Sequence, residues 1–180
     1  VYLFLVGYDY GGVVTHFKRD VESTKRILHH KDIHCLYPGD LYPFTRKPMF
    51  LIIDSDNSYA FQQIPRYFGQ PIVVLMSPEE APPPFHEHQT KGSLFTLFLH
   101  CPLTAICFIS NIVELSFQLF EKGQTQIERF LAEAGRLLVR SRNIDPAYLQ
   151  FYGDDFLRLQ ILRFIFCSVV LKMHRLFKVN

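Results

Sequence analysis

Three short apolar runs divide the first half of the chain, and each ends at a glycine or a polar residue. The runs cover residues 1–6, 49–53 and 71–76. Continuous apolar runs of this length are typical of strands that are buried on both faces, as in parallel sheets. Because stretches long enough for a helix separate the runs, the pattern predicts an α/β fold, with a mostly parallel sheet and flanking helices over residues 1–80.

Two stretches between these runs predict the flanking helices. Residues 21–31 have the composition of a short polar helix. In the second stretch, aromatic and aliphatic side chains recur at roughly helical spacing, and Pro65 bends or shortens the helix. Those side chains are Tyr59, Phe61, Ile64, Tyr67 and Phe68. We therefore expect a short, interrupted helix before the third strand.

The second half of the chain, residues 94–180, is predicted to be all-helical. We expect it to pack on the sheet and to share one continuous core with residues 1–80. One of its helices presents apolar residues at i, i+3, i+4 and i+7, with its charged residues off that face. The predicted buried face is Ile127, Phe130, Leu131, Ala134, Leu137 and Leu138. A turn before Pro146 ends this helix, and a final helix begins at Asp154 and Asp155, whose carboxylates suit a helix N-terminus.

The final helix runs from these acidic residues toward Phe177 and is apolar on almost every side. A helix without a polar face is typical of the centre of a fold, so we expect it to be covered by its neighbours. Arg163 lies on an apolar side of this helix. Because a buried guanidinium is costly unless it is paired, we expect a carboxylate partner for Arg163.

Residues 92–113 contain no formally charged side chain, and that length is enough to cross a bilayer. His100, Pro102 and Asn111 interrupt the stretch, and a polar group in hydrocarbon needs a partner. We therefore expect two helical segments, broken near Cys101 and Pro102 and buried between the sheet and the later helices. A single membrane-spanning helix is the alternative that the sequence leaves open.

Residues 81–93 are predicted to form a proline-rich connector between the two portions. Consecutive prolines with charged and histidine neighbours favour an extended, exposed linker. A polyproline ligand for a partner domain is the alternative interpretation of residues 81–84. The chain also begins inside a predicted strand without an initiator Met, so we expect a fragment of a longer protein.

The net charge of +2 is too small to favour nucleic-acid binding by field alone, and we expect no direct nucleic-acid contact. Residues 123–180 carry nine basic and five acidic side chains, which suits either an acidic partner or a solvated surface. The four cysteines form no CxxC pair, and three lie inside apolar runs. This favours buried, reduced thiols in a reducing compartment over a disulfide framework.

An acidic cluster, Asp54, Asp56 and Ser58, follows the second apolar run. Parallel α/β sheets place their ligands at the carboxyl ends of the strands. The cluster resembles the first motif of haloacid-dehalogenase-like phosphatases, which implies Asp54 as the nucleophile, Asp56 as the general acid and a bound Mg²⁺. It also resembles the metal-binding DxSxS loop of von Willebrand A domains, with Asp56 in place of the middle serine.

The remaining phosphatase motifs are matched only in part. Ser77 fits the second motif, and Asp154 with Asp155 fits the late acidic pair, but that pair leads into a helix instead of closing a strand. Lys91 lies in a predicted loop, and His30 with His34 lacks a third metal ligand. We prefer a turn in which Asp and Ser cap the next helix, and we therefore assign no catalytic, cofactor or metal residue.

Several longer strings carry a more specific resemblance. They include PGDLYPFTRKP at residues 38–48, GSLFTLFL at residues 92–99 and RFIFC at residues 163–167. With these strings, the region from about Tyr37 to Phe177 resembles the C-terminal part of the suppressor of cancer cell invasion family.

The resemblance implies a nuclear and cytoplasmic regulatory protein without known catalytic residues. It implies a corepressor, downstream of Rho signalling, that acts by protein–protein interaction on myocardin-related coactivators of serum response factor and limits cell migration as a tumour suppressor. It also implies a link to DNA double-strand-break repair through a scaffold protein, and membrane association has been proposed for the family. We therefore expect a transcriptional cofactor and no enzyme or bound cofactor; the alternative is a Mg²⁺-dependent phosphohydrolase that uses Asp54 and Asp56.

Overall fold

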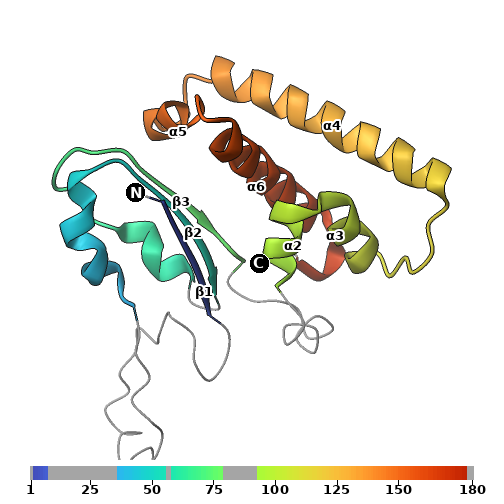
Figure 1. Ribbon diagram of the computed structural model, residues 1–180, viewed down its shortest axis with the longest axis horizontal. Coiled ribbons are helices and arrows are strands. Elements are labelled where there is room, and N and C mark those ends of the chain that lie inside the picture. Colours follow the sequence, from blue (N-terminus) through green and yellow to red (C-terminus); the bar gives the residue numbers. More distant parts are fainter. Residues whose placement is uncertain (1, 8–35, 56–57, 79–92, 178–180) are drawn as a thin grey trace, which may run out of the picture. The chain divides into compact units, whose positions relative to one another are not determined.

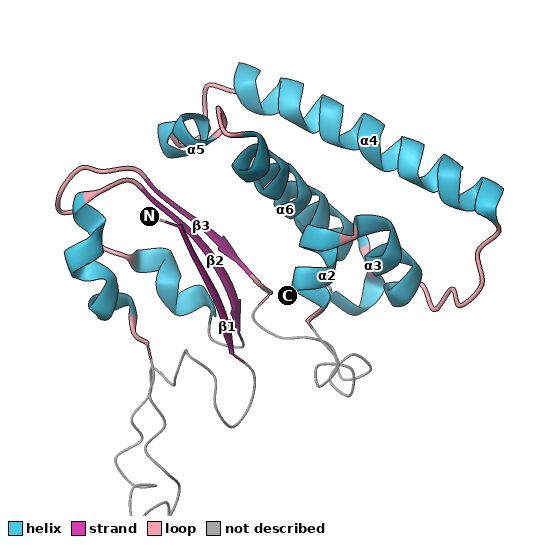
Figure 2. Ribbon diagram, viewed as in Figure 1, coloured by secondary structure: helices cyan, strands magenta, loops and turns pink. Residues whose placement is uncertain are grey.

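The computed structural model describes residues 2–7, 36–55, 58–78 and 93–177 (Figure 1). The chain divides into two compact units, Val1–Glu80 and Ala81–Asn180. The described strands all belong to the first unit and the described α-helices to the second (Figure 2). The predicted helix over residues 21–31 and nearly all of the predicted connector lie outside the described residues. A single core shared by both units stays a prediction.

The sheet of the first unit has three parallel strands in the order β1-β2-β3. They are β1 (Tyr2–Gly7), β2 (Met49–Ser55) and β3 (Ile72–Met76). In the register, Ile53 of β2 lies opposite Leu5 of β1 and Met76 of β3. All 7 residues of β2 are buried, as expected for a central strand of a parallel sheet. The predicted strands and their parallel pairing are confirmed.

Two 3₁₀ helices, η2 (Pro38–Arg46) and η3 (Ser58–Gln63), contribute apolar side chains to a core on one face of this sheet. The core consists of Leu41, Met49, Leu51, Ile53, Phe61, Ile64 and Ile72. The predicted interrupted helix before β3 is therefore the short helix η3, which ends before Pro65. Tyr67, which the helical spacing placed with Phe61, is 72% exposed because the chain has already left the helix.

In the second unit, the uncharged stretch forms α2 (Leu94–His100) and α3 (Pro102–Ile109), and both contact α6 (Asp155–Met173). Cys101 ends the first helix and begins the second. Pro102 starts α3 at the position where a helix tolerates a missing N–H group. The predicted break is therefore confirmed. No helix in the described part of the chain is long and apolar enough to cross a membrane.

Helix α4 (Phe117–Arg140) begins well before the predicted apolar stripe. Ile127 and Leu138 of that stripe are buried, and its charged residues are exposed, as predicted. Leu137 is 61% exposed, so its predicted burial is wrong. Adjacent residues lie about 100° apart around a helix, so the orientation that buries Leu138 turns Leu137 toward solvent.

The last two α-helices begin at aspartate caps. In α5 (Pro146–Phe151), Asp145 Oδ1 accepts a hydrogen bond from the Ala147 amide at 2.9 Å. In α6, Asp154 Oδ1 accepts one from the Leu157 amide at 3.0 Å. Each carboxylate satisfies an amide that has no partner within its own helix. The predicted start of the final helix is confirmed.

Helix α6 is the centre of the helical unit. It contacts α2, α3, α4 and α5, as its apolar circumference predicted. The Phe166 ring lies 5.0 Å from the Phe130 ring of α4 and 6.3 Å from the Phe98 ring of α2, between ring centroids. Tilted and edge-on aromatic pairs of this kind stabilise by about 0.5–1.5 kcal/mol beyond the area that they bury.

Arg163 on α6 binds a backbone carbonyl, so the expectation of a carboxylate partner is wrong for the described residues. Its Nη1 donates to the carbonyl oxygen of Leu99 at 2.8 Å, in the last turn of α2. The last carbonyls of a helix lack intrahelical donors and lie at the negative end of its dipole, so they attract a guanidinium. The buried Nε of Arg163 has no hydrogen-bond partner within the described residues.

Substitutions at Arg163 test this assignment. Arg163→Ala should lower the free energy of unfolding by about 2 kcal/mol, because it removes a charge-assisted hydrogen bond and the packing of the side-chain stem. Arg163→Met keeps an apolar stem and removes the unsatisfied Nε, so it should recover at least half of that loss. Urea denaturation measures both. A loss of about 3–5 kcal/mol for Arg163→Met, as expected when a buried carboxylate loses its partner, would contradict the assignment.

Candidate functional site

Serine hydroxyls tie together the carboxyl ends of β2 and β3. Ser77 Oγ donates to the carbonyl oxygen of Ser55 at 2.9 Å and accepts from the Ser55 amide at 3.1 Å. Ser58 Oγ donates to the carbonyl oxygen of Ser77 at 2.8 Å. These hydroxyls complete backbone hydrogen bonds at the point where the strands end. The serine that matched the second phosphatase motif is therefore part of the sheet's own hydrogen bonding.

The described part of the acidic cluster is also buried. Asp54 is 0% exposed, on the face of β2 that Phe50 and Ile52 share with it through strand alternation. A nucleophile has to reach its substrate, and this side chain presents no surface to solvent. Asp56, the predicted general acid, lies outside the described residues. The geometry of Asp54 and Ser58 therefore favours a structural role for the described part of the cluster.

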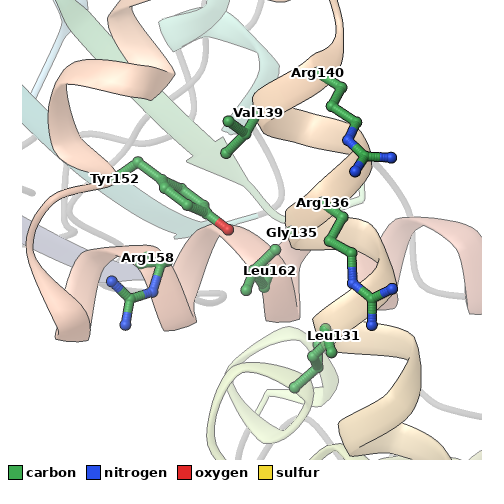
Figure 3. A pocket seen from close by; sticks show the side chains of 9 residues that line it. Leu131, Gly135, Arg136, Val139, Arg140, Tyr152, Arg158 and Leu162 are labelled. Atoms are coloured by element: carbon green, nitrogen blue, oxygen red, sulfur yellow. The ribbon is translucent and has the colours of Figure 1, made fainter.

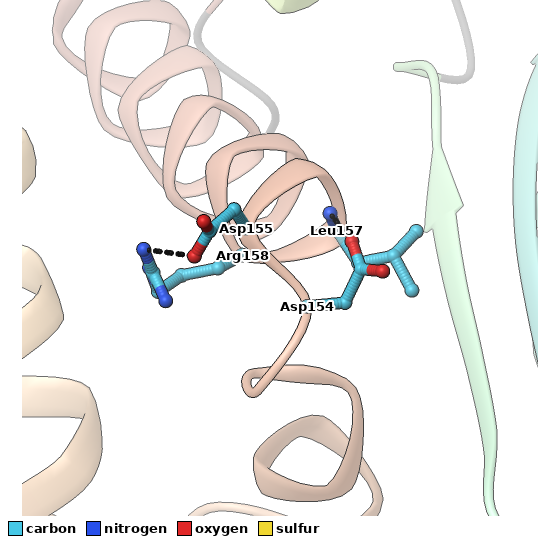
Figure 4. A network of polar contacts seen from close by, with 4 residues as sticks. All are labelled: Asp154, Asp155, Leu157 and Arg158. Carbon is cyan, nitrogen blue, oxygen red and sulfur yellow. Dashed lines mark hydrogen bonds and ion pairs between the residues drawn. The ribbon is translucent and has the colours of Figure 1, made fainter.

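The late acidic pair is placed at the start of α6 (Figure 4). Asp154 caps the helix, and Asp155 Oδ1 binds Arg158 Nη2 at 2.7 Å. The two carboxylates point to different sides of the helix, one toward the Leu157 amide and one toward the guanidinium. Both carboxylates therefore stabilise the N-terminus of α6, where negative charge is favourable.

Metal and thiol chemistry have little support in the described ranges. No three His, Cys, Asp or Glu side chains gather there as metal ligands. His30 and His34 lie outside the described residues. No disulfide joins the three described cysteines: Cys167 is buried and Cys107 is half-buried, whereas Cys101 is exposed at the junction of α2 and α3. The expectation of burial is therefore wrong for Cys101.

A groove of about 500 Å³ opens between α4 and the beginning of α6 (Figure 3). Its floor is formed largely by aliphatic side chains and by the ring of Tyr152, which follows α5. Arg136 and Arg140 extend from α4 on one side of this ring, and Arg158 extends from α6 on the other. The groove thus combines an apolar floor with a cationic rim, defined here as Arg136, Arg140 and Arg158.

Gly135 allows Tyr152 to approach α4 closely. A Cβ atom at Gly135 would lie 2.6 Å from the Tyr152 hydroxyl oxygen and 3.8 Å from two methyl carbons of Leu162. Glycine inside a helix costs about 0.5–1 kcal/mol relative to alanine. The missing side chain at position 135 is what leaves room for the polar end of Tyr152 between the two helices.

The three rim arginines differ in their pairing. Arg158 is held by Asp155, and its guanidinium lies 5.7 Å from the centroid of the Tyr152 ring. Arg136 Nη1 lies 3.3 Å from Glu133 Oε2, in a pair whose side chains are 65% and 56% exposed. Arg140 has no ion pair with any described residue. Positive charge at the rim is therefore only partly compensated.

Charge counting predicted a basic surface after residue 123, but it did not predict a groove. One signal was available: Gly135 interrupts a strongly helical pattern, and such a glycine often marks a close approach of another element. The identity of that other element, the turn that carries Tyr152, depends on tertiary packing and has no local signature.

Comparison with known proteins identifies the family. The family model described as Protein SCAI matches residues 12–177. Protein SCAI of Homo sapiens and that of Mus musculus are 48% and 47% identical over 175 residues, which make up 95% of this chain and 29% of each relative. The Protein SCAI homolog of Dictyostelium discoideum is 38% identical over 148 residues, 82% of this chain and 19% of that protein. No solved structure matches.

The chain therefore belongs to the SCAI family, which confirms the resemblance seen in the sequence strings. It spans 29% of the length of the human and mouse relatives.

Removal of the Ser77 hydroxyl tests the structural role of the strand ends. Ser77→Ala should lower the free energy of unfolding by about 1–3 kcal/mol, because the amide and carbonyl of Ser55 lose their partner. Ser77→Thr, which keeps a hydroxyl, is the control and should lose less. Urea denaturation measures both. Stabilisation of the native chain by Mg²⁺ that disappears in Asp54→Asn would instead indicate a metal site.

A double-mutant cycle tests the contact between Gly135 and Tyr152. Gly135→Ala should gain helix propensity but drive a methyl group into the Tyr152 hydroxyl, so the two effects oppose each other. In a Tyr152→Phe background the hydroxyl is gone, and the same substitution should stabilise the chain by up to about 1 kcal/mol. The expected coupling between the two positions is roughly 1 kcal/mol. Additive effects on thermal unfolding would show that the two residues do not meet.

Proposed function

We propose that the chain is the protein-binding part of a transcriptional corepressor. In this proposal the whole protein works in the nucleus and cytoplasm, binds myocardin-related coactivators of serum response factor, represses the transcription that they drive and so limits cell migration. Membership of the SCAI family supports the proposal. A DNA-repair scaffold protein is a further partner that the same kind of binding surface would suit.

One observation carries the proposal: a run of exposed apolar side chains between α3 and the first turn of α4. Val113 is 91% exposed and Phe117 is 73% exposed. The run consists of Ile112, Val113, Leu115, Phe117, Leu119 and Phe120, and is called the apolar run below. Six exposed large apolar side chains thus occur within nine residues, and exposed apolar side chains that gather on a surface typically mark a protein interaction site. Burial of each large apolar side chain in a complex stabilises it by about 1.5–3 kcal/mol.

The phosphohydrolase alternative has less support than protein binding, because the polar groups that it would use are engaged in other contacts. Ser77 completes the hydrogen bonds of Ser55, Asp154 caps α6, and Asp155 binds Arg158. Each of these side chains already has a partner within the fold. Binding by surface side chains therefore accounts for more of the described structure than phosphate chemistry at the strand ends.

Substitution within the apolar run of the full-length protein tests the proposal. Val113→Gln combined with Phe117→Gln should weaken binding to a myocardin-related coactivator by at least about tenfold, because each substitution removes apolar contact area from the interface. Phe156→Gln is the matched control: it also lies in the first turn of a helix and is 64% exposed. Co-precipitation and a reporter driven by serum response factor measure binding and repression.

Two results would contradict the proposal. The first is a full-length protein that neither co-precipitates the coactivator nor represses the reporter. The second is turnover of a generic phosphate ester that disappears in Asp54→Asn, which would restore the phosphohydrolase alternative.

A further inference from the structure

The side chains that line the groove between α4 and α6 determine which kind of ligand can bind there. Its floor includes Leu131, Val139 and Leu162, and Val139 is still 57% exposed. Apolar surface that stays open to water is available for burial by a partner. Three arginines line the groove: the Arg158 side chain lies on the same side of α4 as the Tyr152 ring, whereas the guanidinium groups of Arg136 and Arg140 point away from that ring (Figure 3). A ligand that fills the groove therefore has to bring apolar groups and negative charge together.

We propose that this groove binds an acidic segment of a partner protein, in which carboxylates flank one or two large apolar side chains. The inference rests on the proposed function and adds to it a second surface and the chemistry of the segment bound there. Guanidinium groups suit this role because they bind carboxylates through two parallel hydrogen bonds. Tyrosine and arginine, which line the groove, are the residue types that most often dominate protein interfaces.

The rim arginines would contribute differently to such a complex. Arg140 has no ion pair with any described residue and is the first cation available to a partner carboxylate. Arg136 forms an exposed ion pair with Glu133, and exposed pairs of this kind contribute little, so a partner carboxylate can replace Glu133 at small cost. Arg158 pairs with Asp155 and lies 5.7 Å from the centroid of the Tyr152 ring, so it has more partners within the fold than the other two rim arginines.

The balance of charges favours a peptide over nucleic acid. Nucleic-acid surfaces gain affinity by neutralising many phosphates at once. Here only three arginines line the groove, and two of them already pair with Glu133 and Asp155, so few cations remain to neutralise a phosphate backbone. Nucleic acids also bind through open aromatic faces, whereas the guanidinium of Arg158 lies over the ring of Tyr152.

The test selects peptides on the 180-residue chain from a phage-displayed library of random linear sequences. Synthetic copies of the enriched peptides are then titrated by fluorescence anisotropy. The rim variant, Arg136→Gln with Arg140→Gln, removes two exposed cations. The control variant, Lys122→Gln with Arg129→Gln, removes the same charge from exposed positions of the same helix that do not line the groove. Circular dichroism checks that both variants remain folded.

We expect the enriched peptides to combine Asp or Glu with Leu, Phe or similar residues. They should bind the rim variant about tenfold more weakly or worse, which corresponds to the loss of at least one charge-assisted contact, and should bind the control variant as they bind the native chain. Enrichment of neutral or basic peptides would overturn the proposal. Equal weakening by both variants would also overturn it, since that result indicates a general charge effect.

Two further results would assign the groove to another occupant and overturn the proposal. One is binding of duplex DNA that displaces the peptide and depends on the same two arginines. The other is self-association of the chain that disappears in the rim variant.

Failure of this inference differs from failure of the proposed function. In one outcome the chain selects no acidic peptide, and the full-length protein with the rim substitutions still co-precipitates its coactivator and represses transcription. The proposed peptide binding in the groove is then wrong, whereas the proposed function is supported. In the other outcome acidic peptides bind through the rim arginines, but the full-length protein neither binds the coactivator nor represses transcription. Peptide binding in the groove is then supported, whereas the proposed function is wrong.

Discussion

Helix α6 has apolar side chains on almost every side, and the rest of the helical unit buries most of those in its middle, whereas Phe156 and Met173 near its ends stay exposed. Helices α2, α3, α4 and α5 all contact it, because burial of its apolar side chains is favourable. The break at Cys101 divides one uncharged stretch into two helices that both contact α6. Arg163 of α6 donates a hydrogen bond to a carbonyl in the last turn of the first of these helices. The groove forms beside this packing, where Gly135 lets the polar end of Tyr152 lie between α4 and α6.

The ends of the parallel strands show how a structural requirement can resemble an active site. Strands that end inside a protein leave backbone groups that need hydrogen-bond partners, and serine side chains supply them here. Aspartate serves the same purpose at the beginning of a helix, as Asp154 does. Short acidic and hydroxyl motifs at strand ends therefore indicate catalysis only when their polar atoms remain available. The exposed surfaces of the helical unit have more capacity for binding.

Features that depend on local rules could be predicted from the sequence. The strands, their parallel pairing, the break at Pro102 and the start of α6 at Asp154 follow from apolar periodicity and from the preferences of proline and aspartate. Features that depend on a particular neighbour could not. The exposure of Leu137 and Cys101, the carbonyl partner of Arg163 and the groove at Tyr152 arise from the relative positions of helices. A local pattern gives at most a hint, as Gly135 does for a close approach, and does not identify the neighbour.

The most direct test of the central claim, that the helical surface binds partners while the strand ends are structural, is hydrogen–deuterium exchange. The chain would be measured alone and with a myocardin-related coactivator bound. We predict slower exchange in the complex across the apolar run, which ends in the first turn of α4. Slower exchange confined to the ends of β2 and β3 around Ser55 and Ser77, with the apolar run unchanged, would contradict the claim.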